Sequence, residues 1–399
     1  MNKRHGAEAV HGLGGGTVST KSQKNLEKAE ELCRKNRPSD AVPPLLRAIK
    51  DEQNLDAWIQ MAFMCDRNKA VEILEMAEST GRMLMQTTLG SDAFADDGPH
   101  VGKFWDILAA RPYMRVLQAQ VRMYFETKNY TRSAETIIEM MRLCPGDNMG
   151  QRDWLGSLLL RLHRDADALH FAQVWINASE GGGMPPLRGG TTFRAPHRDV
   201  FSGEREKALS DPVWGPAVHL HNAALAAFRL RGPCPQATQY LRMAARANPH
   251  VLVKILGRRS RPDALNMDAR AINGPEAAHD YRFLTQDLWT APQAWAWITG
   301  DETVNNELLK ICSRPECPAL ESQATQFKRC AACHQAIYCG KACQKGDWMR
   351  HKRECQEHRA LKKTIRDFQA NNPNTTSIPI YAADLANGTP VVYDGTSFL

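Results

Sequence analysis

Seven cysteines and one histidine lie between residues 312 and 355, and this cluster constrains the fold more than any other feature of the sequence. They follow the pattern C-x4-C-x12-C-x2-C-x5-C-x3-C-x7-H-x3-C. Its members are Cys312, Cys317, Cys330, Cys333, Cys339, Cys343, His351 and Cys355. Eight such side chains are the number that two tetrahedral zinc sites require. We therefore predict a small module that folds around two Zn²⁺ ions.

The spacing within the cluster indicates how the ligands are presented. Cys330 and Cys333 have the separation of a zinc knuckle, in which a tight turn directs both sulfurs to one ion. Cys339 and Cys343 are four residues apart, as are His351 and Cys355, so on a helix each pair shares a face. The spacing alone permits more than one division of the eight ligands between two ions. In any division, four protein ligands fill each site and leave no open position, so we expect structural zinc.

Residues around these ligands carry a family resemblance. Tyr338 and Cys339, Gln344, Trp348, and the His351–Lys352 pair with the final Cys355 resemble the pattern of MYND-type zinc fingers. The resemblance covers roughly 45 residues. Four residues separate Cys312 from Cys317, where two are commonest in the family, and fungal-type members often have this wider gap.

The resemblance implies both a ligand pairing and a function. In MYND fingers the pairs interleave, so Cys312, Cys317, Cys339 and Cys343 are expected to bind one zinc ion, and Cys330, Cys333, His351 and Cys355 the other. The family is a non-catalytic interaction module that commonly docks short proline-containing peptides. The matching peptide-binding positions here are Tyr338, Gln344 and Trp348. An alternative is that Trp348 packs under the last helix of the finger.

The sequence before the finger is helical in pattern, with apolar residues spaced by three and four. A repeat of small and large residues recurs in it, with a proline following two of its four copies. Its copies are Ala41, Leu45 and Ala48; Ala70, Leu74 and Ala77; Ser133, Ile137, Met140 and Pro145; and Ala237, Leu241, Ala244 and Pro249. This pattern resembles tetratricopeptide (TPR) helix hairpins. An unrelated helical bundle is the alternative.

The expected fold is therefore mainly α: a TPR-like helical-repeat solenoid followed by a cross-braced, two-zinc MYND finger. We divide the chain into a disordered tail (1–22), a TPR-like region (23–300), the finger with its following helix (301–368) and an extended C-terminal tail (369–399). A Gly- and Pro-rich insertion at 180–212 interrupts the repeats. It is either functional or disordered.

Composition and the N-terminal sequence bear on where in the cell the protein is expected. The 399 residues carry a formal charge of +7, and no apolar run is long enough to span a bilayer. The N-terminus has no apolar stretch of the kind found in secretory signals, so we expect an intracellular protein of the cytoplasm or nucleus. The cysteines outside the cluster are scattered, which argues against a disulfide scaffold.

Three functions fit this sequence to different degrees. The first is a zinc-binding protein–protein interaction adaptor without enzymatic activity, whose partners are proline-containing protein segments. The second is a MYND-associated lysine methyltransferase, but the sequence has no Asn-His motif of the kind a SET domain carries. The third is a nucleic-acid-associated regulator that uses the basic residues of the finger and after it. Those residues are Arg350, Lys352, Arg353, Lys362 and Lys363. Base-stacking aromatics are not interleaved with them, so we expect a solvated helix face.

Overall fold

The computed structural model describes residues 7–180, 184–266, 272–371, 379–380 and 391–392. The described chain is mainly helical and divides into two compact units. The first contains residues up to 167 together with 180–194, and the second contains 168–179 together with the residues from 195 onward. None of the described helices is both long and apolar enough to cross a membrane.

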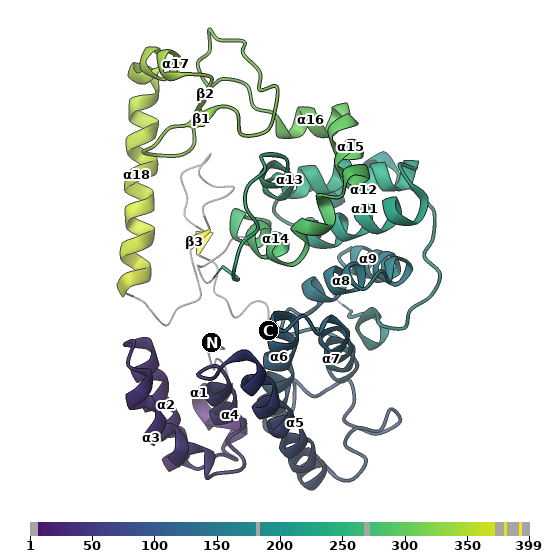
Figure 1. Cartoon of the computed structure of the whole chain (residues 1–399), viewed down its shortest axis with the longest axis vertical. Coiled ribbons are helices and arrows are strands. Elements are labelled where there is room, and N and C mark those ends of the chain that lie inside the picture. Colours follow the sequence, from purple (N-terminus) through teal and green to yellow (C-terminus); the bar gives the residue numbers. More distant parts are fainter. Residues whose placement is uncertain (1–6, 181–183, 267–271, 372–378, 381–390, 393–399) are drawn as a thin grey trace. The chain divides into compact units, whose positions relative to one another are not determined.

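The first unit is built from helices that pack against their sequence neighbours (Figure 1). They are α1 (Ala7–His11), α2 (Thr20–Arg34), α3 (Pro38–Ile49), α4 (Leu55–Ala62), α5 (Arg67–Leu89), α6 (Arg111–Glu126), α7 (Tyr130–Leu143) and α8 (Arg152–Arg161), with short 3-10 turns η1 (Leu13–Gly15), η2 (Leu108–Ala110) and η3 (Leu187–Gly190). N-terminal capping by side chains explains where several of these helices begin. Asn54, Asp66 and Asn129 each accept a hydrogen bond from a backbone N–H of the first turn that follows.

The second unit contains further helices and then the zinc-finger segment. The helices before the finger are α9 (Asp165–Ala178, whose first residues belong to the first unit), α10 (Gly203–Leu209), α11 (Ala217–Arg231), α12 (Pro235–Ala247), α13 (Pro249–Leu256), α14 (Pro275–Trp289), α15 (Pro292–Gly300) and α16 (Glu302–Leu308). The finger contains a two-residue antiparallel ladder, β1 (Lys328–Arg329) with β2 (Ile337–Tyr338), then α17 (Lys341–Gly346) and α18 (Trp348–Asn371).

The repeated small and large residues are buried in every copy. They lie on α3, α5, α7 and α12, and each of them is at most 3% exposed. In α7 the small member Ser133 also donates its hydroxyl to the carbonyl of Val121 on α6, at 2.9 Å. Small side chains at these positions allow the two backbones to approach closely. The structure thus has packed helix pairs at the predicted places, while a TPR architecture as such remains a prediction.

The N-terminal segment differs from the disorder expected for residues 1–22. Residues 1–6 lie outside the described residues, but residues 7–22 form α1, η1 and the start of α2. Glu8 is the reason: its carboxylate lies 2.7 Å from a guanidinium nitrogen of Arg115, which also pairs with Asp56 at 2.7 Å. All three side chains are at most 8% exposed. An ion pair with a residue 107 positions away has no local sequence signal.

The insertion at 180–212 is also ordered outside residues 181–183, which are not described. In the first unit, Gly189 adopts a positive φ of 62° and lies so close to Met141 that an added Cβ would be 2.8 Å from that side chain. In the second unit, the amide of Gln173 pairs with both backbone groups of His197, and that of Gln239 pairs with both of Phe201. These amide side chains act as a strand partner for an extended segment.

The predicted C-terminal tail (369–399) lies mostly outside the described residues. Residues 369–371 belong to the end of α18 rather than to the tail. Two short strands, β3 (Pro379–Ile380) and β4 (Val391–Val392), pair antiparallel.

The buried Glu8–Arg115–Asp56 cluster predicts a large cost when its cation is removed. Arg115→Met would leave two buried carboxylates without a partner, and we expect about 3–5 kcal/mol of destabilisation. Urea unfolding followed by circular dichroism measures this. Arg37→Met is the matched control, because Arg37 and Asp40 form an exposed pair that contributes at most about 1 kcal/mol. Equal stabilities of the two variants would contradict this account of the N-terminal segment.

Candidate metal centre

The first ligand pair lies on a loop that closes on itself. Ile311 and Leu320 form an isolated antiparallel bridge, and the N–H of Cys312 donates to the carbonyl of Ala319 at 2.9 Å. Within the loop, the N–H of Cys317 donates to the carbonyl of Arg314, which forms a tight turn. This folds the four residues between the two cysteines back, so the wider gap still brings both sulfurs to one place.

The second pair lies on the predicted knuckle. The N–H of His334 donates to the carbonyl of Cys330 at 2.9 Å, and His334 has a positive φ of 63°. The N–H of Cys330 in turn donates to the carbonyl of Ala336, at the β1–β2 ladder. A residue in the left-handed region closes the turn tightly, so both sulfurs point to the same side.

Of the other two pairs, His351 and Cys355 lie on a helix as their spacing predicts, whereas Cys339 lies before helix α17 rather than on it. Cys339 follows β2, and Cys343 lies on α17, with the two sulfurs 3.4 Å apart. His351 and Cys355 lie one turn apart on α18 and are almost completely buried. The α18 pair therefore supplies two ligands from one helix face, and the other pair joins the end of β2 to α17.

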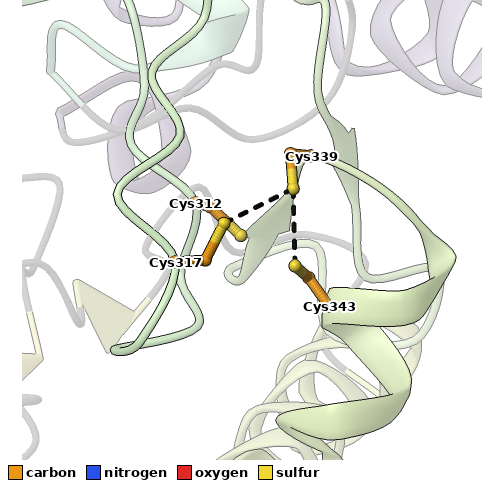
Figure 2. Close-up of side chains that lie close together, drawn as sticks. All are labelled: Cys312, Cys317, Cys339 and Cys343. Carbon is orange, nitrogen blue, oxygen red and sulfur yellow. Dashed lines mark hydrogen bonds between the residues drawn. The ribbon is translucent and has the colours of Figure 1, made fainter.

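The structure divides the eight ligands into two groups of four, and the division is the interleaved one. Cys312, Cys317, Cys339 and Cys343 form the first cluster; Cys330, Cys333, His351 and Cys355 form the second. Figure 2 shows the first cluster, in which Cys339 faces the loop on one side and Cys343 on the other. In each cluster the ligand atoms all lie within 4.8 Å of one another.

The distances fit tetrahedral zinc. A Zn–S bond of about 2.3 Å places two sulfurs of a tetrahedron about 3.8 Å apart. The first cluster has sulfur separations of 3.7 Å (Cys317–Cys339) and 3.4 Å (Cys339–Cys343). The second has 3.9 Å between Cys330 and Cys355, and the Nε2 of His351 lies 3.3 Å from the sulfur of Cys333. The two clusters are therefore suited to two Zn²⁺ ions, one bound by four cysteines and the other by three cysteines and a histidine.

The electrostatics of the second cluster also call for a cation. Burial would raise the pKa of Cys330, but backbone N–H groups of Cys333 and Ala332, together with His351, lower it to about 6. Burial and the neighbouring sulfurs of Cys330 and Cys333 raise the pKa of Cys355 to about 11. One thiolate therefore disfavours the next, and a divalent cation between them lets all of them ionise together.

A buried polar group next to the ligands holds the start of α18. The carboxylate of Asp347 is 4% exposed and accepts hydrogen bonds from Tyr338 (2.8 Å) and Arg350 (2.7 and 2.8 Å). Burial alone would raise the pKa of Asp347, but these hydrogen bonds outweigh it and lower the pKa. The carbonyl of Asp347 accepts from the N–H of His351, so this network positions a zinc ligand.

The three predicted peptide-binding residues do not share one environment. Tyr338 is 1% exposed and its hydroxyl donates to Asp347, so its side chain is not on the exposed surface, and its role in peptide binding stays a prediction. Gln344 on α17 is half-buried. Trp348 at the start of α18 is 41% exposed, and its ring lies edge-on to His351 with the ring centres 6.3 Å apart. Its neighbour Met349 is 86% exposed, and no sequence motif singles it out.

Comparison with known proteins gives a match at the finger. The protein-family model for the MYND finger matches residues 310–355, so this segment is a MYND finger. F-box protein At5g50450 of Arabidopsis thaliana is 37% identical over 60 residues, which are 15% of this chain and 18% of that protein. F-box protein At1g67340 of the same plant is 32% identical over 85 residues (21% and 20%).

A third relative, SET domain and MYND-type zinc finger protein 6 of Schizosaccharomyces pombe, is 43% identical over 47 residues, 12% of this chain and 10% of that protein. The chain thus spans no more than 20% of the length of these relatives. No solved structure matches it.

The interleaved clusters predict a zinc count that depends on single ligands. Zinc per chain, measured by elemental analysis, is expected to be two in the unaltered protein and one in Cys339→Ala, because a site with three ligands left loses most of its affinity. Cys65→Ala is the control, since Cys65 is an exposed cysteine outside both clusters. Two zinc ions retained by Cys339→Ala would contradict the assignment.

Proposed function

We propose that this protein is a non-enzymatic interaction adaptor, in which the MYND finger docks a proline-containing segment of a partner. The completeness of both zinc clusters carries the proposal. Each has four protein ligands, so neither ion offers the open position that catalytic zinc requires. Zinc then serves to build a surface, and MYND fingers generally mediate protein interactions.

The exposed apolar residues at the start of α18 support a docking role. Trp348 and Met349 are adjacent and exposed, and they directly follow Asp347, whose own side chain is buried. An exposed indole gives an extended, proline-containing peptide a flat apolar surface, and the amide of Gln344 can pair with its free backbone groups. Tyr338 contributes indirectly, by holding Asp347.

The helical region is proposed as a second binding element with TPR-like organisation. The support is the recurrence of one buried pattern of a small and then a large residue on α3, α5, α7 and α12, with a further small residue in all but α7. Stacked helix pairs of this kind present extended surfaces to partners. In the proposed adaptor, the MYND finger binds a short peptide segment, and the helical region provides a larger surface for a second partner.

Two other functions have less support. The SET-domain relative matches this chain only across a stretch the length of the finger, so its printed description gives no reason to assign a methyltransferase activity here. For nucleic-acid binding, three of the basic residues have partners within the finger. Arg350 pairs with Asp347, Arg353 with Glu357, and Lys362 donates to the carbonyl of Cys333 at 2.7 Å.

Trp348→Ala tests the docking proposal. Removing a central aromatic anchor commonly costs about 2 kcal/mol or more, so we expect about a 30-fold loss of affinity for peptides selected from a proline-containing library. Isothermal titration calorimetry measures the affinity, and zinc analysis should still give two ions per chain. Leu320→Ala is the control, because Leu320 is a comparably exposed apolar residue of the same finger. Unchanged affinity for every selected peptide would exclude Trp348 as the anchor.

A further inference from the structure

The two zinc clusters differ in how far solvent reaches their ligands. All four ligands of the second cluster are at most 2% exposed. In the first cluster only Cys312 is buried; Cys317 and Cys343 are half-buried and Cys339 is exposed. Oxidants and electrophiles that act on thiolates therefore reach the first cluster through Cys339.

The surroundings of the sulfurs add to this difference. In the second cluster, the sulfur of Cys333 accepts a hydrogen bond from the N–H of Gln335 at 3.4 Å, which stabilises its charge and reduces its nucleophilicity. In the first cluster, the Arg314 side chain lies close to Gly346 at the end of α17 and pairs with Glu316 at 3.0 Å.

Helix α17 depends on the first cluster. It has six residues and buries none of them. An isolated helix of this length is not stable in water, because nucleation is unfavourable and few hydrogen bonds follow. Cys343 is the zinc ligand on this helix and Cys339 lies just before it, so loss of the first zinc would release α17 together with Gln344.

We propose that Cys339 is an oxidation site at which peroxide empties the first zinc site and releases α17, while the second site stays loaded. The Cys339 thiolate attacks hydrogen peroxide, forms a sulfenic acid and expels hydroxide. The thiolate of Cys343 or Cys317, whose sulfurs lie 3.4 and 3.7 Å away, then attacks this sulfur and displaces a second hydroxide. Two thiolates lose two electrons, peroxide becomes two waters after taking up two protons, and Zn²⁺ leaves.

This inference rests on the proposed function for its consequence, because the released helix carries Gln344 of the docking surface. A thiol reductant and added zinc would restore the site, since the disulfide step is reversible.

The test uses the full chain loaded with two zinc ions and dilute hydrogen peroxide. A chromogenic zinc chelator follows release, and peptide mass mapping identifies the oxidised cysteines. We expect one zinc to leave at least about ten times faster than the other, because only one cluster has an exposed thiolate. The expected product is a disulfide from Cys339 to Cys343 or Cys317, with the cysteines of the second cluster still reduced. Release of both ions at one rate, or first oxidation in the second cluster, would overturn the proposal.

Two variants sharpen the result. Cys339→His keeps a zinc ligand but removes the exposed thiolate, so its first zinc should leave several-fold more slowly. Cys65→Ser removes an exposed cysteine elsewhere and should leave the rates unchanged. Peptide affinity is measured separately on the one-zinc form. Selective release with no peptide affinity in any form would retain the oxidation site and remove the docking function, whereas unselective release would remove the oxidation site alone.

Discussion

Zinc coordination is the interaction on which the C-terminal module depends. Few of the finger's apolar side chains are buried, and its core consists largely of the ligands themselves together with Tyr338 and Ala336. Because the ligand pairs interleave, each zinc ion joins an early loop to a helix later in the segment. Binding energies of about 10–16 kcal/mol per structural zinc in peptides exceed what so small a core supplies.

The small core of the finger also explains why large apolar side chains are exposed on its surface. Asp347, which precedes α18, is buried with Tyr338 and Arg350, while Trp348 and Met349, the first two residues of α18, remain exposed. A module with a larger core would cover an indole and a thioether at these positions. Here the interior is already filled by sulfur, imidazole and one hydrogen-bonded phenol, so the large apolar groups face outward.

The sequence was sufficient to predict features that depend on residues close together in the chain, namely the zinc ligands and the small residues at helix contacts. The eight ligands and their helical spacing were recognisable, as were the small residues such as Ala41, Ala70 and Ser133 that let helices approach. The division of ligands between two ions came from the family resemblance, since spacing left it open. The sequence did not reveal that Tyr338 is internal, because a buried phenol needs its partner Asp347 to be placed by the fold. Glu8 was missed for a similar reason: it is ordered by Arg115, far along the chain.

The extended segment at 197–201 is held through its backbone rather than through its side chains. Its backbone is held by Gln173, Gln236 and Gln239 through N–H and C=O groups, which every residue except proline offers in the same form. The path of the segment is therefore held by three glutamines on two helices, α9 and α12, and not by the side chains of His197 and Asp199. Replacing one of these glutamines would remove support from the backbone of the segment, whereas replacing His197 or Asp199 would leave the same backbone hydrogen bonds in place.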